Sequence, residues 1–116
     1  MRKKGDRCPC LKDCPISEVI QRIGGKWKLQ IICALSADGA TRYNVLKRKI
    51  QGVSNTMLAA SLQELEQDGL VIREQFAEIP PRVEYRLSKA CQDLVPIIDK
   101  LGEWNYRVKK QKRNTA

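Results

Sequence analysis

Four glycine-containing breaks divide residues 15–69 of this 116-residue chain into short segments. They are Gly24-Gly25, Asp38-Gly39, Gly52-Val53 and Asp68-Gly69. Glycine ends helices and permits turns, so each segment has room for a helix of only about two to four turns. The breaks therefore predict a series of short helices over this part of the chain.

Apolar residues at helical spacing support one helix in each segment. The predicted helices span residues 15–23, 26–37, 43–50 and 54–67, and a short extended piece at 40–42 precedes the third. Pro15 suits the first helical position, where its missing N–H breaks no hydrogen bond, and Ser54 is a good N-cap for the fourth helix. Three leucines form the expected buried face of that fourth helix: Leu58, Leu62 and Leu65.

After residue 69 the pattern changes to two strand-like runs, at 70–76 and 82–87. The residues between them include Pro80-Pro81, which cannot pair with a neighbouring strand, so the runs predict a hairpin with a projecting loop. Ser88 is expected to cap a long last helix that ends near Lys110. Pro96 should kink this helix or shorten it by a turn.

Two short helices joined by a tight glycine-containing turn and followed by a β-hairpin form the pattern of a winged helix-turn-helix. The predicted fold class is therefore mainly α with a small β-hairpin wing (α+β). A chain of this length buries one core. We expect a basic, cysteine-containing arm at 1–14, a domain at 15–106 that includes the dimerisation helices, and a basic tail at 107–116.

The net charge of +9 arises from 22 Lys and Arg residues against 13 Asp and Glu. The arm has five cations and two acids, and the tail has five cations and no acid. This charge favours a polyanionic partner and attracts nucleic acid without regard to its sequence. Residues 39–63 also carry four cations and no acid. A membrane partner is not expected, because the longest apolar run has five residues, whereas about 20 are needed to span a bilayer.

The chain contains no histidine. Ser-His-Asp and Cys-His catalysis and HExxH zinc hydrolysis are thereby excluded, and no enzymatic activity, cofactor or metal site is expected. The five cysteines are an odd number, in a chain with enough aliphatic residues to form a core without disulfides. They indicate a reducing compartment, so we expect a cytoplasmic, nucleoid-associated protein.

The outer face of the predicted fourth helix carries small and amide side chains near its N-terminus. Such side chains can approach base edges closely, and the helix dipole favours a phosphate there. Cations on the preceding helix suit the DNA backbone, and a cation beside the Pro80-Pro81 loop suits a minor groove. The candidate DNA-binding residues are Arg42, Asn44, Lys47, Arg48, Ser54, Asn55, Thr56, Ala59, Ala60, Gln63 and Arg82. The alternative is a solvated cationic face with no partner.

The last helix is too apolar for a monomer, because two apolar stripes run side by side along it. The stripes are Cys91, Leu94, Ile98 and Leu101, and Ile97, Leu101, Trp104 and Val108. One stripe can cover the domain's own core and the other needs a partner, unless both pack on the first helix within the monomer. The candidate dimer residues are Ile16, Ile20, Ile97, Leu101, Trp104 and Val108. A dimer would place two recognition helices about 34–36 Å apart, which suits a palindromic operator.

Cys8, Cys10 and Cys14 lie close together, and Cys14 is the predicted N-cap of the first helix. A helix dipole favours a thiolate at that position, and an exposed thiol of low pKa is what the sensing of oxidants or electrophiles requires. Three interpretations stay open: sensing at Cys14 with Cys8, Cys10 or a partner-chain cysteine as the resolving thiol, zinc binding by the cluster, or inert thiols. Cys33 is expected in the core.

Three motifs resemble the HxlR-type branch of the MarR-like bacterial transcription regulators. They are IGGKW at 23–27, ML at 57–58 followed by LQELEQDGLV at 62–71, and IPPRVEY at 79–85. The match runs in order from about Cys14 to Trp104, and Thr56 departs from it by standing where a larger basic or amide residue is expected. The resemblance implies a homodimeric winged-helix protein with its fourth helix in the major groove. It also implies dimerisation through the first and last helices and a sensing cysteine at Cys14.

The sequence therefore predicts a sequence-specific regulator of transcription that binds double-stranded DNA as a homodimer and is switched by oxidation or electrophile modification of an N-terminal cysteine. One alternative is a nonspecific, architectural nucleic-acid-binding protein, which explains the charge but not the leucine-striped fourth helix. Another is a regulator controlled by a small ligand or a metal. A thiol oxidoreductase would need a Cys-x-x-Cys motif on a βαβ scaffold, and the sequence has neither.

Overall fold

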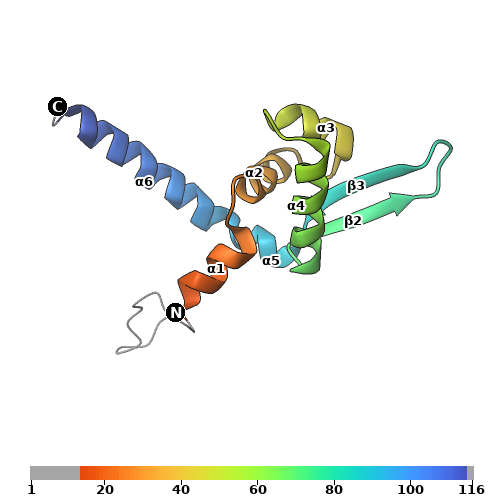
Figure 1. Cartoon of the computed structure of the whole chain (residues 1–116), viewed down its shortest axis with the longest axis horizontal. Coiled ribbons are helices and arrows are strands. Elements are labelled where there is room, and N and C mark those ends of the chain that lie inside the picture. Colours follow the sequence, from red (N-terminus) through yellow and green to blue (C-terminus); the bar gives the residue numbers. More distant parts are fainter. Residues whose placement is uncertain (1–13, 115–116) are drawn as a thin grey trace.

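A computed structural model describes residues 14–114 of the chain. Figure 1 shows a small body from which one hairpin and one long helix project in different directions. The elements in chain order are α1 (Pro15–Ile23), α2 (Lys28–Asp38), β1 (Thr41–Arg42), α3 (Tyr43–Lys49), α4 (Asn55–Gln67), β2 (Val71–Phe76), β3 (Arg82–Leu87), α5 (Lys89–Gln92) and α6 (Val95–Asn114). The predicted winged helix-turn-helix fold, mainly α with a small β-hairpin wing, is confirmed.

The three strands form one antiparallel sheet in the order β1-β3-β2. Strands β2 and β3 pair along their full length, from Val71 opposite Leu87 to Phe76 opposite Arg82. Strand β1 adds two residues to the free edge of β3, so the hairpin is anchored at its base and projects at its tip. The peptide bond before Pro80, in the loop at that tip, is cis.

The core lies where α2, α3, α4 and the base of the sheet meet. Most of its members are aliphatic, and they include Ile31, Ile32 and Leu35 from α2, Leu46 from α3, Leu58, Leu62 and Leu65 from α4, and Val71 and Leu87 from the sheet. The predicted leucine face of the fourth helix is confirmed, since these three leucines are at most 2% exposed. Burying this face fixes which side of α4 is left to face the solvent.

The turn between α3 and α4 is tight for two local reasons. Gly52 has a φ of +83°, which an L side chain rarely adopts, so glycine is required there. Ser54 then caps α4, because its hydroxyl oxygen accepts a hydrogen bond of 3.1 Å from the backbone N–H of Met57. The predicted cap at Ser54 is confirmed, and the turn sets the angle between the two helices.

The last helix differs from the expectation of one long helix. It is split into α5 and α6, and α6 begins one residue before Pro96. A proline lacks the N–H that an interior helical position needs, and it fits without loss in a first turn. The chain therefore ends one helix and starts another, and α6 then continues to Asn114, through most of the segment expected as a tail. No helix within residues 14–114 combines the length and the apolar character that a membrane span needs.

Candidate nucleic-acid interface

The solvent-facing side of α4 is small, polar and free of cations. We call the exposed residues of α4 from its start to Gln63 the recognition surface: Asn55, Thr56, Met57, Ala59, Ala60 and Gln63. Glu64, Glu66 and Gln67, in the last turn, are exposed as well. Sequence reasoning found every residue of the recognition surface except Met57, which is 46% exposed. Met57 was missed because a methionine beside a leucine stripe is usually a core residue. Its position one residue before Leu58, a turn of about 100° around the helix, was the available signal.

The start of α4 is tied to the helix before it. The hydroxyl of Tyr43 on α3 donates to the backbone oxygen of Asn55 at 3.1 Å and lies 3.2 Å from its side-chain Oδ1. Together with the Ser54 cap, this contact fixes the first turn of α4. Ser54 and Asn55, both predicted to touch DNA, therefore have roles in holding the helix as well.

Cations border the recognition surface on the side of β1 and α3. Arg42 and Arg48 are exposed, Lys47 is half-buried, and Asn44 is exposed beside them. Lys49 is engaged elsewhere, because its ammonium forms an ion pair with Asp38. The predicted cations of residues 42–48 thus lie on β1 and α3, the two elements that precede α4 in the chain.

Arg82 lies at the wing, as predicted, but its guanidinium does not project as a free cation. It forms ion pairs of 2.8 Å with Glu78 and 3.5 Å with Glu84, and it stacks 4.1 Å from the centre of the Phe76 ring. Glu84 lies two residues along the same strand, so both side chains share one face of the sheet. At the tip, Ile79 is fully exposed instead. Contact of Arg82 with a minor groove stays a prediction, and in this structure its guanidinium is held by the two glutamates.

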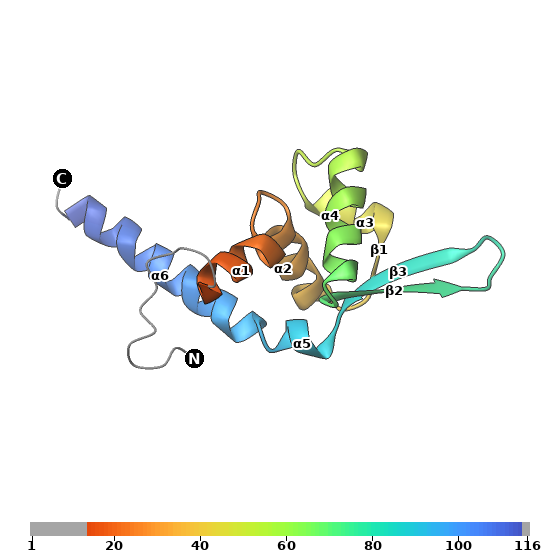
Figure 2. The same ribbon diagram turned by 60° about the horizontal axis from the view of Figure 1, so that its bottom comes forward.

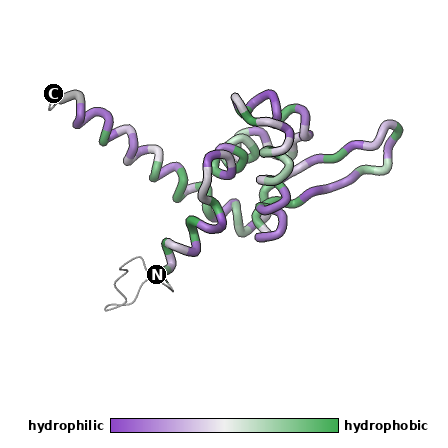
Figure 3. Tube along the Cα trace, in the orientation of Figure 1, coloured by the Kyte–Doolittle hydropathy of each residue, from purple (hydrophilic) through white to green (hydrophobic). Residues whose placement is uncertain are grey.

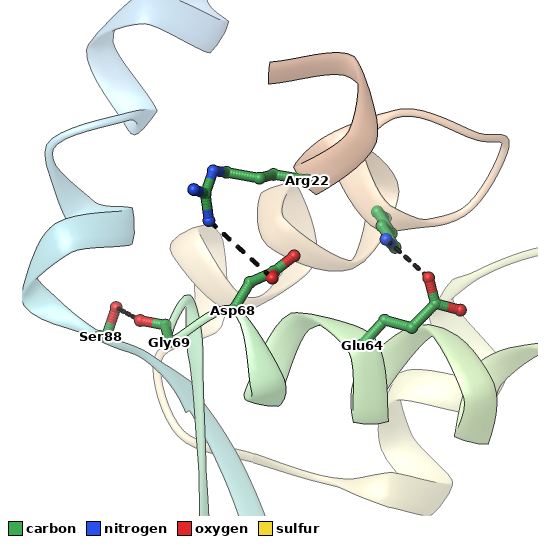
Figure 4. A network of polar contacts seen from close by, with 6 residues as sticks. Arg22, Glu64, Asp68, Gly69 and Ser88 are labelled. Atoms are coloured by element: carbon green, nitrogen blue, oxygen red, sulfur yellow. Dashed lines mark hydrogen bonds and ion pairs between the residues drawn. The ribbon is translucent and has the colours of Figure 1, made fainter. Parts of the chain in front are cut away.

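Ion pairs and a hydrogen bond hold the C-terminal half of α4 to the rest of the body (Figure 4). Glu64 accepts from the ammonium of Lys28 at 2.9 Å, and Lys28 is 8% exposed. Asp68, just after α4, lies 3.9 Å from Arg22 of α1. The Ser88 hydroxyl donates to the Gly69 carbonyl at 2.6 Å. Through these contacts α1, α2 and the sheet all position the recognition helix.

Away from the recognition surface, α1 and α6 leave large apolar side chains in solvent. We call this set the apolar flank: Ile16, Val19, Ile20, Ile97, Leu101, Trp104 and Val108. Figure 3 shows hydrophobic positions recurring on α1 and along the projecting α6. Helix α6 packs on the core only through its first turns and the residue before them, at Leu94, Val95 and Ile98. The alternative that both stripes pack within the monomer is therefore wrong.

The cysteines are placed differently from three of the expectations. Cys14 is the N-cap of α1, as predicted, but it is 3% exposed and disulfide-bonded, so it is not the exposed thiol that was expected. Cys33 is exposed rather than in the core, and Cys91 is fully buried in the core rather than on a dimer stripe. Cys8 and Cys10 lie outside the described residues.

The two free thiols of the described residues have raised pKa values. Partial desolvation, and then the charge of Asp99, raise the pKa of Cys33, which sits in a groove between α2 and α6. Burial alone raises the pKa of Cys91. Within residues 14–114, no three His, Cys, Asp or Glu side chains gather in a way that would hold a metal ion. Neither free thiol has the lowered pKa that a reactive cysteine needs.

The HxlR-like helix-turn-helix family model matches residues 22–113. An uncharacterized HTH-type transcriptional regulator of Methanothermobacter thermautotrophicus is 38% identical over 103 residues, which are 89% of this chain and 78% of that protein. The solved structure of the redox regulator HypR in its oxidized form has a TM-score of 0.75 and 37% identity, and the match covers 81% of this chain and 96% of that one. A putative MarR-family transcriptional regulator from Porphyromonas gingivalis W83 has a TM-score of 0.76 and 38% identity over 82% of this chain and 92% of its own.

Proposed function

The chain belongs to the HxlR-like helix-turn-helix family and is a transcriptional regulator of the helix-turn-helix type, and from this premise we propose that it binds a specific operator in double-stranded DNA as a homodimer. Its matched relatives and solved neighbours are regulators rather than enzymes. We place its action on nucleoid DNA in the cytoplasm. A change in the redox state of Cys14 is the proposed switch.

The observation that carries the proposal is the two-sided character of α4. Its leucine face is locked into the core, and the opposite face presents the recognition surface. A major groove about 12 Å wide admits an α-helix. Small side chains let the helix approach the base edges, and its N-terminal N–H groups attract a phosphate. A solvated surface helix has no comparable need for an exposed side without Lys and Arg.

The cations beside α4 suit contacts with the DNA backbone. Arg42, Lys47 and Arg48 border the recognition surface, and phosphate contacts of this kind set the register of a protein on DNA without reading its sequence. Asn44 is a further donor to the backbone. The proposed role of Arg82 is to hold the wing rigid through Glu78 and Glu84, with the tip of the hairpin placed against the neighbouring minor groove.

The exposed side chains of the apolar flank support the proposal that the protein is a homodimer. Exposed apolar patches of this size on a small protein mark interaction sites. Two copies related by a twofold axis would bury the flank of each against the other and present two α4 helices to one face of DNA. Helices about 34–36 Å apart then meet successive major grooves, which requires a palindromic operator.

Cys14 is suited to a switch because of where it lies. It caps α1, which contributes Ile16 and Ile20 to the apolar flank and contacts the end of α4 through Arg22 and Asp68. Two thiols that form a disulfide lose two electrons and two protons, which an oxidant such as diamide accepts. The second thiol is Cys8, Cys10 or a cysteine of the partner chain. A shift of α1 would change the separation of the two α4 helices in the dimer. A coupling free energy of about 1–3 kcal/mol between the redox state and DNA binding would alter operator affinity roughly 5–150-fold.

DNA selection followed by footprinting tests the proposal. A random duplex pool is passed over the full-length protein, and bound sequences are recovered, sequenced and footprinted. A palindromic site with a protected repeat of about one helical turn is expected. Uniform weak binding without enrichment would instead identify a nonspecific, architectural protein. Lys47→Ala should weaken binding to all sequences alike and lower the slope of log affinity against log salt by about one.

The redox switch is tested separately, on the selected operator. Because Cys14 is disulfide-bonded in the structure, the protein is first reduced with dithiothreitol, and binding is then measured with and without diamide, for the wild type and for Cys14→Ser. We expect diamide to change the affinity of the wild type and to leave Cys14→Ser unaffected. Equal responses in the two proteins would exclude Cys14 as the sensor. Cys33→Ser is the matched control, because Cys33 lies in a different groove, and it should respond like the wild type.

A further inference from the structure

We propose that α4 selects A·T base pairs in each operator half-site, by apolar contact with thymine methyl groups and by an amide contact from Gln63 to adenine. This inference rests on the proposed function and adds the class of DNA sequence that the protein reads. It is drawn from which side chains the recognition surface contains and which it lacks.

The recognition surface has no side chain that pairs well with guanine. In the major groove, guanine presents the acceptors O6 and N7, which Arg and Lys read. The sequence of α4, Asn55–Gln67, contains neither residue type. The neighbouring cations Arg42, Lys47 and Arg48 lie on β1 and α3, at the border of the surface, where backbone phosphates are within easier reach. Guanine is therefore left without a reader on this helix.

Cytosine is also poorly served. Its N4 donor is read by carboxylates, and α4 carries two, Glu64 and Glu66. Glu64 is engaged in an ion pair with the ammonium of Lys28 on α2, at 2.9 Å. Glu66 is one residue from the end of the helix, almost three turns from the N-terminal part that enters a groove. Neither carboxylate belongs to the recognition surface.

The side chains that remain match A·T pairs. The centre of the recognition surface is the alanine pair Ala59 and Ala60, with Thr56 and Met57 one turn before them. Alanine and the threonine methyl group contact the C5-methyl group of thymine, and the small alanines let the backbone of the helix come close to the groove floor. The apolar centre of the recognition surface therefore suits the C5-methyl group of thymine.

One free amide completes the pattern. Gln63 lies one turn beyond Ala59 on the same line along the helix and is exposed. A glutamine amide donates to adenine N7 and accepts from adenine N6, a pairing that no other base offers. Asn55 has the same chemistry, but its Oδ1 already lies against the Tyr43 hydroxyl. Gln63 is therefore the residue that we assign to adenine.

Selection from a random duplex pool gives the first test, using the full-length protein. Positions at the centre of each half-site should be enriched in A·T pairs. Enrichment of G·C pairs there would overturn this inference and leave the proposed function intact, since a specific operator would still exist. A pool with no enrichment would defeat the proposed function itself. The two failures are thus distinguishable in one experiment.

Replacing thymine by uracil gives the sharper test, because it removes only the C5-methyl group. Each central thymine of the selected operator is replaced singly, and affinity is measured with fluorescently labelled duplexes. We expect affinity to fall about fourfold at each contacted thymine, the factor for losing one buried methyl group. The same replacement outside the half-sites is the control and should have no effect. Unchanged affinity at every central position would overturn the inference.

Gln63→Ala tests the amide contact, with Gln67→Ala as a matched control on the same helix. Gln67 lies one turn beyond Gln63, at the C-terminal end of α4, where it lines the cleft between α1 and α4. Gln63→Ala should lose the preference for adenine at one position, by about tenfold, while Gln67→Ala keeps it. Both residues are exposed, so thermal unfolding should show both variants folded. Loss of the preference in both variants, or in neither, would contradict the assignment.

Discussion

The recognition surface lies on α4 and the apolar flank lies on α1 and α6 (Figure 1), and the two differ in how much of their support comes from this chain. The recognition surface is carried by α4, whose other face, formed by Leu58, Leu62 and Leu65, is buried in the core. The apolar flank is carried by α1 and α6, and its own side chains are unburied, with Trp104 57% exposed and Ile20 61% exposed.

This difference indicates two kinds of partner. DNA offers charged and polar groups, so a surface that reads it can be polar and small, and it must be rigid before the partner arrives. A second copy of the chain offers apolar groups, so its surface stays incomplete until the copy binds. Folding of the single chain is thus enough to order the recognition surface, whereas the apolar flank is buried only when the dimer forms.

Trp104→Glu, in the apolar flank, should have the largest effect of these substitutions, because it should dissociate the proposed dimer. A twofold interface contains each residue twice, so a charge at this position is buried twice in the dimer. With about 2 kcal/mol for each lost aromatic contact, the dimer dissociation constant should rise about a thousandfold. Sedimentation or light scattering at micromolar concentration checks this, and operator affinity should fall with the dimer.

Tyr106→Glu is the matched control for that experiment. Tyr106 is an exposed aromatic residue on the same helix, and it lies about half a turn away from the Trp104 stripe. The variant should remain a dimer with normal operator affinity. A monomeric Tyr106→Glu, or a Trp104→Glu that stays dimeric, would place the interface on another face of α6.

Leu58→Ala should lower the unfolding free energy of the core beneath the recognition surface. Leu58 is fully buried on the core face of α4, and removing a leucine side chain from a core leaves a cavity that costs about 2–5 kcal/mol of unfolding free energy. Urea denaturation measures the loss. The substitution should be made in the Trp104→Glu protein, so that dimer dissociation does not contribute to the measured unfolding free energy.

Leu101→Ala in the same background is the comparison. Leu101 is 51% exposed in the monomer, so its truncation should change the unfolding free energy by less than about 0.5 kcal/mol. A large loss from Leu101→Ala would mean that the apolar flank folds back on its own chain. The contrast between the two leucines therefore measures directly which of the two surfaces is supported by folding.

Most of the helices and strands around the recognition surface could be predicted from the sequence, because the signals for them are local. Helix 15–23 and strand 82–87 agree with α1 and β3 at both ends, and the Ser54 and Ser88 caps are formed as expected. Capping and amphipathic spacing depend on neighbouring residues. The buried face of α4 followed from three leucines at one spacing.

The sequence could not predict features that depend on contacts between distant elements. Proline rules allow either a kink or a new helix start at Pro96, and the packing of α6 on α2 decides between them. The pairing of Arg82 with Glu78 and Glu84 arises only when the hairpin forms. The exposure of Cys33 depends on how much of α2 is covered by α6.

Glu64→Gln tests the ion pair that joins α4 to α2. Lys28 is buried, and its ammonium has Glu64 as an ion-pair partner. Removing that negative charge leaves a desolvated cation without compensation, which should lower the unfolding free energy by about 1–2 kcal/mol. Lys28→Met together with Glu64→Gln should recover part of this loss. Asp68→Asn, which affects an exposed pair 3.9 Å long, should cost at most about 1 kcal/mol.

The smallest of these effects concerns the two free thiols of the described residues. Their reactivity compares the core, at Cys91, with the groove beside α6, at Cys33. Cys33, in the groove beside α6, should react with iodoacetamide in the native protein, while Cys91 in the core should react only after unfolding. The raised pKa of Cys33 means that its rate should keep increasing with pH above the range where an ordinary thiol has already ionised. Asp99→Asn removes a nearby negative charge that disfavours the thiolate, so the pKa falls and the rate at a fixed pH should rise about twofold. Peptide mapping by mass spectrometry distinguishes the two sites. Equal labelling of Cys91 in the native protein would mean that the core around the sheet opens as readily as the groove under α6.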